Sequence, residues 1–141
     1  MRIEKRIAVL DTSVVVAGIF WKSDAYRCLA ALARRRFFAV ASQSLIAEYR
    51  RVAARLQAEQ ESDRNPRPVL DWLETTARKV ELWPLADPVS RDAGDDVFIA
   101  TALAAKASFV VTHDPDLLIL EKPFGIEMIR PREFLRRISK T

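Results

Sequence analysis

Ile7-Ala-Val-Leu10, followed at once by Asp11-Thr12-Ser13, is the most informative segment of this 141-residue chain. The four residues before Asp11 are all apolar and include β-branched side chains, a pattern typical of a strand buried on both faces. In open parallel sheets, ligands bind at the edge where such strands end. The segment therefore predicts a central parallel strand that places Asp11 at a ligand-binding edge.

Helical and strand-like segments alternate along the rest of the chain. A polar stretch with Pro66 and Pro68, Gln57 to Pro68, predicts a loop. Apolar spacing of three and four residues predicts helices over 13–20, 24–35, 42–56, 69–79, 96–106, 114–120 and 131–138, and short apolar runs predict strands over 37–41, 80–85, 109–112 and 126–129. The alternation predicts an α/β fold with three layers, α/β/α, around a central parallel sheet of about five strands.

Length and composition limit the class of protein. Half of the residues are hydrophobic and 30% are charged, the balance of a soluble globular protein, and the length suits a single domain over 1–141. The longest apolar run, Val14 to Trp21, is too short to span a bilayer, and the first residues do not resemble an export signal. Cys28 is the only cysteine, so no intrachain disulfide forms, and we expect a cytoplasmic protein.

The net charge of +4 and the pI near 9.6 favour a polyanionic partner. The cations gather in three clusters: Arg34 to Arg36, Arg50 and Arg51 with Arg55, and Arg136 and Arg137 with Lys140. Each cluster is also explained as the solvated face or end of a helix. Charge alone therefore does not decide the function.

Four carboxylates are predicted to converge on one edge of the sheet. Asp11 and Asp114 each come just past the end of a predicted buried strand, and parallel strands end at the same edge. Glu48 lies beside the apolar face of its helix, and Asp96 has the same relation to the apolar face of a later helix. These acids are expected to point toward the domain.

Each of these acids also has an ordinary structural explanation. Asp11 and Asp114 are suited to cap the helices that follow them. Asp96 is favoured in the first turn of a helix by the helix dipole, and Glu48 can pair with Arg51 one turn later. The residues alone leave these explanations open.

Several carboxylates that converge repel one another, and burial makes their charged forms costlier, so a shared cation is the natural occupant. The sequence has no set of cysteines and histidines with zinc-ligand spacing. Oxygen ligands suit Mg²⁺ or Mn²⁺, ions that also bind phosphate oxygens. This reasoning predicts metal-assisted chemistry on a phosphodiester.

The same residues resemble the PIN-domain nucleases in order and spacing. The resemblance is carried by Val9-Leu-Asp-Thr-Ser13, by Glu48 on its amphipathic helix, by Arg91-Asp-Ala-Gly-Asp-Asp-Val-Phe-Ile-Ala-Thr-Ala-Leu103, and by Val111-Thr-His-Asp-Pro-Asp-Leu-Leu118. The closing Ile129-Arg-Pro-Arg-Glu-Phe-Leu135 is similar to the PIN subgroup that forms the toxin components of toxin–antitoxin pairs.

The resemblance implies a role for each matching acid. Asp11 stands at the position of the first metal-binding aspartate of the family, and Glu48 at that of its helix glutamate. Asp96 matches the aspartate that opens the alanine-rich helix, and Asp114 the aspartate after the fourth strand. Asp116 matches a further acid that is often present two residues later.

Five neighbouring residues are expected to support these acids. Thr12 and Ser13 stand where the family keeps a hydroxyl and a small polar residue, although many members have asparagine in place of Ser13. Thr112 and His113 precede the late aspartate, and many members have glycine in place of His113. Because Asp95 directly precedes Asp96, the sequence does not decide which of the two is the ligand at the start of the alanine-rich helix.

The resemblance implies an endoribonuclease that needs Mg²⁺ or Mn²⁺, cleaves RNA, forms a homodimer and is blocked by an antitoxin encoded next to it. Two alternatives remain. One is a catalytically silent PIN fold that binds RNA or protein. The other is a phosphoryl-transfer domain with aspartates at strand ends, although here the residue two after Asp11 is Ser13 rather than the second aspartate of an Asp-x-Asp phosphatase motif.

Overall fold

The computed structural model describes residues 6–82 and 96–139. Within these residues, five parallel strands form one sheet in the order β3-β2-β1-β4-β5. The strands are β1 (Ile7–Leu10), β2 (Phe38–Ala41), β3 (Arg78–Lys79), β4 (Phe109–Val111) and β5 (Glu127–Ile129). The expected parallel sheet of about five strands, with β1 at its centre, is confirmed.

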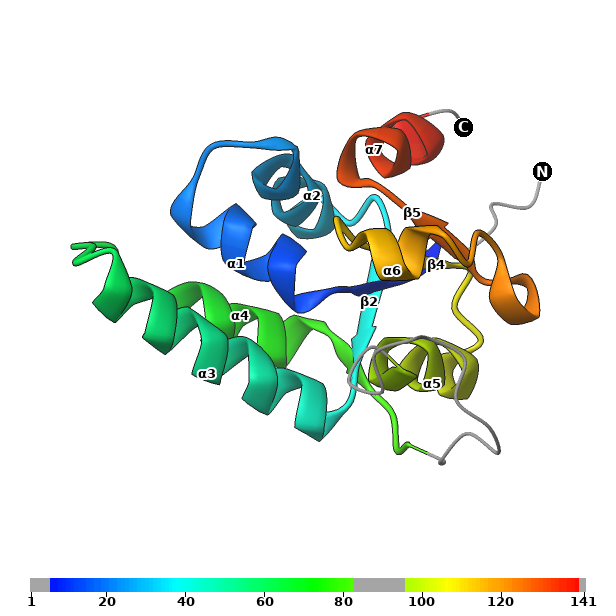
Figure 1. Ribbon diagram of the computed structural model, residues 1–141, viewed down its shortest axis with the longest axis horizontal. Coiled ribbons are helices and arrows are strands. Elements are labelled where there is room, and N and C mark those ends of the chain that lie inside the picture. The colour runs from blue at the N-terminus through cyan, green and yellow to red at the C-terminus, as the bar shows by residue number, and fades with distance from the viewer. Residues whose placement is uncertain (1–5, 83–95, 140–141) are drawn as a thin grey trace.

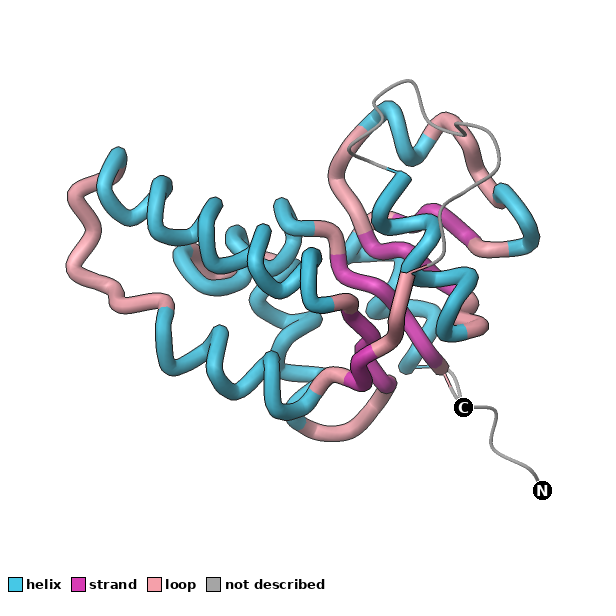
Figure 2. The backbone as a smooth tube through the Cα atoms, turned by 90° about the horizontal axis from the view of Figure 1, so that it is seen from below, coloured by secondary structure: helices cyan, strands magenta, loops and turns pink. Residues whose placement is uncertain are grey.

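Helices cover both faces of this sheet. They are α1 (Thr12–Phe20), α2 (Asp24–Ala33), α3 (Gln43–Glu59), α4 (Arg67–Thr76), α5 (Asp96–Ala105), α6 (Pro115–Leu118) and α7 (Pro131–Ser139), with a 3₁₀ turn, η2 (Pro123–Gly125). In Figure 1, α2 and α7 lie on one side of the sheet and α5 on the other, which gives the three expected layers. Helices α3 and α4 form an antiparallel pair joined by residues 60–66 (Figure 2).

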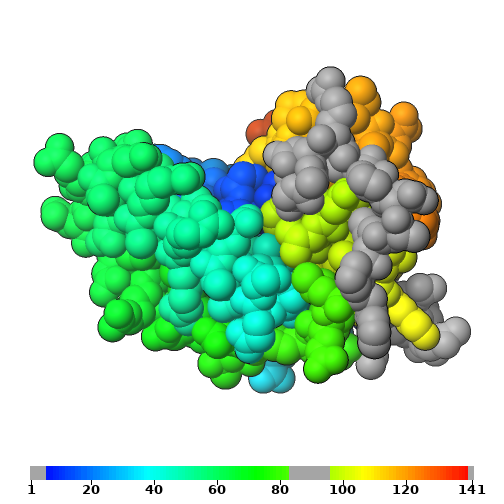
Figure 3. Space-filling model, turned by 60° about the horizontal axis from the view of Figure 1, so that its bottom comes forward, coloured from blue at the N-terminus to red at the C-terminus, as the bar shows by residue number. Residues whose placement is uncertain are grey.

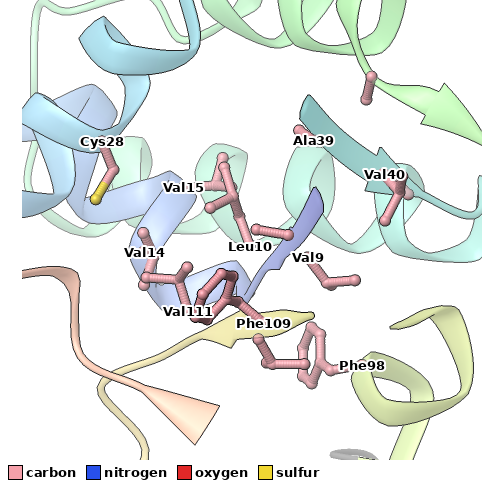
Figure 4. Close-up of a cluster of buried hydrophobic side chains, with 14 of the residues drawn as sticks. Val9, Leu10, Val14, Val15, Cys28, Ala39, Val40, Phe98, Phe109 and Val111 are labelled. Atoms are coloured by element: carbon pink, nitrogen blue, oxygen red, sulfur yellow. The ribbon is translucent and has the colours of Figure 1, made fainter. Parts of the chain in front are cut away.

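The central strand is buried on both faces, as its apolar sequence requires. Val9 is fully buried and Leu10 is 1% exposed. Figure 4 shows Val15 of α1 and Phe98 of α5 on opposite sides of this strand. Each large apolar side chain buried in this way contributes about 1.5–3 kcal/mol to folding. Asp11 therefore follows directly on a buried strand at the centre of the sheet.

The strand order reverses beside β1. The chain passes from β1 to β2 and β3 on one side, and then crosses to β4 and β5 on the other. The backbone amide of Asp11 donates to the carbonyl of Val111 at 2.9 Å, which joins the ends of β1 and β4. Such a reversal of strand order is where open α/β sheets bind ligands, at the carboxyl ends of their strands.

The structure differs from the expected elements in the region around the prolines. Helix α3 runs through Glu59, and α4 begins at Arg67, so the loop between them is shorter than predicted. Pro66 occupies the N-cap position of α4 and Pro68 lies in the first turn, where a missing amide hydrogen costs no helical hydrogen bond. The expected strand over 80–85 was also misplaced: β3 comes earlier, residues 80–82 are not in a strand, and 83–85 lie outside the described residues.

No helix in the described ranges has both the length and the apolar character that crossing a membrane requires.

Candidate active site at the carboxyl edge of the sheet

Asp11 lies just past the end of β1, beside the end of β4. It caps α1 by accepting from the backbone amide of Ser13 at 3.4 Å, so the capping explanation holds. Its second oxygen accepts from the hydroxyl of Ser13 at 3.2 Å and from the hydroxyl of Thr112 at 2.5 Å. The residue is 6% exposed, and burial raises the pKa of its carboxyl, with a smaller contribution from the charge of Asp114. Asp11 is therefore a buried acid beside a second acid.

Thr112 connects Asp11 to the acids that follow β4. Its side chain is fully buried, and its oxygen accepts from the backbone amide of Asp114 at 2.9 Å while its hydroxyl donates to Asp11. Asp114 in turn caps α6 by accepting from the amide of Asp116 at 2.9 Å. Asp116 is partly buried in the first turn of α6, and His113 is exposed. The predicted site residues of segment 112–116 therefore lie at the same edge of the sheet as Asp11.

Glu48 reaches the same region from α3. One of its oxygens accepts a short hydrogen bond from the hydroxyl of Thr12, the residue after Asp11. Its other oxygen lies 3.7 Å from a guanidinium nitrogen of Arg51, so the predicted helix pair is also present. The side chain of Glu48 remains 31% exposed and that of Arg51 66% exposed. The glutamate is thus brought to the start of α1 while part of it faces solvent.

Asp96 opens α5, which packs against β1, β2 and β4. Because α5 leads into the amino end of β4, the start of the helix faces the carboxyl edge, where Asp11 lies. Asp96 is partly buried. Asp95, the alternative ligand, lies outside the described residues.

Tyr49, which follows Glu48 on α3, is a site neighbour that the sequence analysis does not single out. It is 2% exposed, and its hydroxyl donates to the carbonyl of Leu10 at 2.5 Å. Burial raises the pKa of the phenol well above its usual value, and the charges of Asp11 and Glu48 raise it further. The available signal was chemical: a tyrosine at a fully buried position needs a partner for its hydroxyl.

Only part of the basic surface lies near these acids. Arg51 pairs with Glu48, whereas Arg34 to Arg36 directly precede β2 and so lie at the opposite, amino edge. The end of α7 also lies at that edge, because Arg6, just before β1, donates to the carbonyl of Ile138. The first basic cluster and the arginines of the third therefore lie at the edge opposite the acids.

The space-filling view agrees with this arrangement. Figure 3 shows the blue surface of the early described residues in a hollow between the cyan and green surface of α3 and the yellow-orange surface of α6. The hollow leaves the neighbourhood of the first helix open to solvent.

In the described part of the chain, no three histidine, cysteine, aspartate or glutamate side chains stand close enough together to hold a metal ion. The acids are instead engaged by hydroxyls, backbone amides and Arg51. The residue types still fit a hard divalent cation, because the donors are carboxylate oxygens. In addition, burial and the negative charge of Asp114 both disfavour the ionised form of Asp11, and a bound cation would offset this.

Comparison with known proteins identifies the family. The sequence pattern of the PIN domain matches residues 7–116, so the chain belongs to the PIN domain family. PIN domains are generally nucleases that depend on divalent metals such as Mg²⁺ or Mn²⁺. No curated protein matches the chain in sequence.

A solved structure shows the same fold. PAE2754 from Pyrobaculum aerophilum superposes with a TM-score of 0.68, and the match covers 96% of this chain and 91% of that chain. The two sequences are 17% identical, so this similarity supports the fold alone.

Proposed function

We propose that this protein is a metal-dependent endoribonuclease that hydrolyses phosphodiester bonds of RNA at the carboxyl edge of its sheet. The observation that supports this most is the buried Asp11, which lies at the strand-order reversal and is joined through Thr112 to Asp114. A carboxylate buried beside another carboxylate is costly unless a cation is shared. Membership of the PIN domain family supplies the class of reaction.

The proposed ligands are the four acids at this edge. Asp11, Glu48, Asp96 and Asp114 hold Mg²⁺ or Mn²⁺, and Asp116 completes the acidic set in the first turn of α6. Such an ion, when bound, activates a water molecule and stabilises the charge on the leaving oxygen of the phosphodiester.

The neighbouring residues orient the acids. Thr112 and Ser13 hold the Asp11 carboxylate through their hydroxyls, and Thr12 holds one oxygen of Glu48. His113 is exposed between two site residues and is proposed to contact the substrate. Asp95 remains the alternative ligand to Asp96.

We also propose the biological setting: one PIN domain over 1–141, cytoplasmic and homodimeric, acting as the toxin of a toxin–antitoxin pair. The segment from Ile129 to Leu135, which resembles the toxin subgroup, supports this. The adjacent open reading frame provides a test. A short DNA-binding protein encoded there is the expected result, and its absence would favour a solitary RNA-processing nuclease.

A second candidate function is a catalytically silent PIN fold that binds RNA or protein. The observation in its favour is that the described acids already have partners within the chain, including two helix caps and one ion pair.

The deciding experiment is cleavage of a mixed pool of single-stranded RNA by the purified protein with Mg²⁺, Mn²⁺ or EDTA. Asp11→Asn and Asp96→Asn are assayed beside it. The proposed function predicts metal-dependent cleavage that both substitutions abolish. Retained RNA binding without cleavage under any metal would support the silent alternative.

A further inference from the structure

We infer that Tyr49 is a positioning residue that sets the separation of Asp11 and Glu48 through its hydrogen bond to the Leu10 carbonyl. This inference rests on the proposed function, since it concerns the geometry of two proposed ligands. Tyr49 itself is not proposed to touch the metal or the RNA.

The argument begins with two pairs of adjacent residues. Leu10 directly precedes Asp11 at the end of β1, and Tyr49 directly follows Glu48 on α3. The tyrosine hydroxyl donates to the Leu10 carbonyl at 2.5 Å, across 39 residues of sequence. One hydrogen bond therefore ties the backbone that carries the first acid to the helix that carries the second.

The sheet explains why the Leu10 carbonyl is available. Strand β2 pairs with β1 up to the match of Val9 with Val40, and it ends at Ala41 where the chain turns into α3. The carbonyl of Leu10 lies beyond that pairing in a buried position, and a buried carbonyl needs a donor. Tyr49, on the helix α3 that follows β2, supplies this donor.

The same peptide unit is held from its other side. The amide of Asp11 donates to Val111 on β4 at 2.9 Å, while the carbonyl of Leu10 accepts from Tyr49 on α3. The peptide plane before Asp11 is thus fixed by α3, which carries Glu48, and by β4, which Thr112 directly follows. Tyr49 is 2% exposed, so its hydroxyl is held away from solvent.

Tyr49→Phe tests the inference, because it removes the hydroxyl and keeps the ring. Mn²⁺ binding is measured by electron paramagnetic resonance, and thermal unfolding is measured in parallel. We expect the Mn²⁺ Kd to rise about 10- to 100-fold, the usual effect of losing an orienting partner outside the ligand shell. Ile138→Val is the matched control, since Ile138 is 3% exposed on α7 at the opposite edge.

The control should lower the Tm without changing the Mn²⁺ Kd. If Tyr49→Phe bound Mn²⁺ with the same Kd as the wild type but had a lower Tm, the role of Tyr49 would be purely structural and the inference would be overturned. Failure of the wild-type protein to bind Mn²⁺ would instead overturn the proposed function, and the inference with it.

A second measurement keeps Tyr49 in place, so it does not depend on whether Tyr49→Phe folds. The chain has only two tyrosines, so incorporation of 3-fluorotyrosine gives two ¹⁹F signals, assigned with Tyr26→Phe. Saturation with Mg²⁺ should shift the signal of Tyr49 and leave that of Tyr26, on the exposed face of α2, unchanged. An unmoved Tyr49 signal, with Mg²⁺ binding seen by calorimetry, would overturn the inference.

Discussion

Asp11 at the carboxyl edge of the sheet and Glu127 at the amino edge have opposite surroundings. At the carboxyl edge, Asp11 is buried against hydroxyls, and burial raises the pKa of its carboxyl. At the amino edge, Glu127 at the start of β5 accepts two hydrogen bonds from Arg137, at 2.9 and 2.8 Å, and the pKa of its carboxyl is lowered. Glu127 is paired with an arginine of this chain, whereas Asp11 is buried against hydroxyls and a second acid, which suggests a cation from outside the chain.

The largest expected effect comes from removing the charge at the carboxyl edge. Asp11→Asn should reduce metal-dependent RNA cleavage at least about 100-fold, more than the loss of a partner outside the ligand shell typically costs. Asparagine caps helices as well as aspartate, and it removes a buried charge opposed by Asp114. The Tm without metal should therefore be unchanged or higher. A large drop in Tm would show that the carboxylate serves mainly to stabilise the fold.

The next effect concerns the buried hydroxyl that holds Asp11. Thr112→Val should weaken Mn²⁺ binding about 10- to 100-fold, because the Asp11 carboxylate and the Asp114 amide both lose a partner. Calorimetric titration with Mn²⁺ measures this. Thr101→Val is a matched control, since Thr101 is also fully buried and its hydroxyl donates only within α5, to Val97. Equal affinity loss in both variants would contradict a specific role for Thr112.

A smaller effect on RNA cleavage is expected from the basic residues, and it should differ between the two edges of the sheet. Arg51→Gln should raise the KM for RNA a few-fold, because Arg51 is exposed beside Glu48 and a phosphate contact is worth about a factor of ten or less at physiological salt. Arg35→Gln, at the amino edge, should leave kcat and KM unchanged. Steady-state cleavage at two salt concentrations checks both. A larger KM change in Arg35→Gln would place the RNA on the other edge.

The smallest effect is expected at the amino edge itself. Glu127→Gln should lower the free energy of unfolding by about 1 kcal/mol or less, as for other partly exposed ion pairs, and should leave cleavage intact. Because the folded pKa of Glu127 lies below its unfolded value of about 4.5, the ion pair contributes fully above that pH. This contribution is lost as the pH falls through the folded pKa.

Urea unfolding of the wild type and Glu127→Gln between pH 7 and pH 3 measures that loss. The stability difference between the two proteins should shrink as the pH falls. A constant difference across this range would show that Arg137 does not stabilise the ionised form of Glu127.

Most of the fold could be predicted from the sequence, because the apolar pattern that specifies β1 and its neighbouring strands lies within a few consecutive residues. Continuous apolar runs such as 7–10 and 109–111 specify buried parallel strands, and all five strands of the described sheet are parallel. The prolines at the start of α4 were misread because proline breaks a helix in its interior but is tolerated in its first turn. The two-residue β3 was too short to show a periodic pattern.

The site was partly predictable for the same reason. Asp11 and Asp114 follow strand ends, so topology alone brings them to one edge. The bonds that connect the acids were not predictable, because Tyr49 to Leu10 and Thr112 to Asp11 join residues 39 and 101 positions apart. Such contacts depend on how α3 and β4 pack against β1, and a local sequence pattern does not predict that packing.

The most direct test of the carboxylate site is calorimetric titration of Mn²⁺ into the wild type, Asp11→Asn and Glu127→Gln, each free of metal at the start. The proposed site predicts that the wild type and Glu127→Gln bind Mn²⁺ with the same Kd and that Asp11→Asn binds at least about 100-fold more weakly. Equal affinity in Asp11→Asn, or no binding to the wild type, would contradict a metal site at the carboxyl edge.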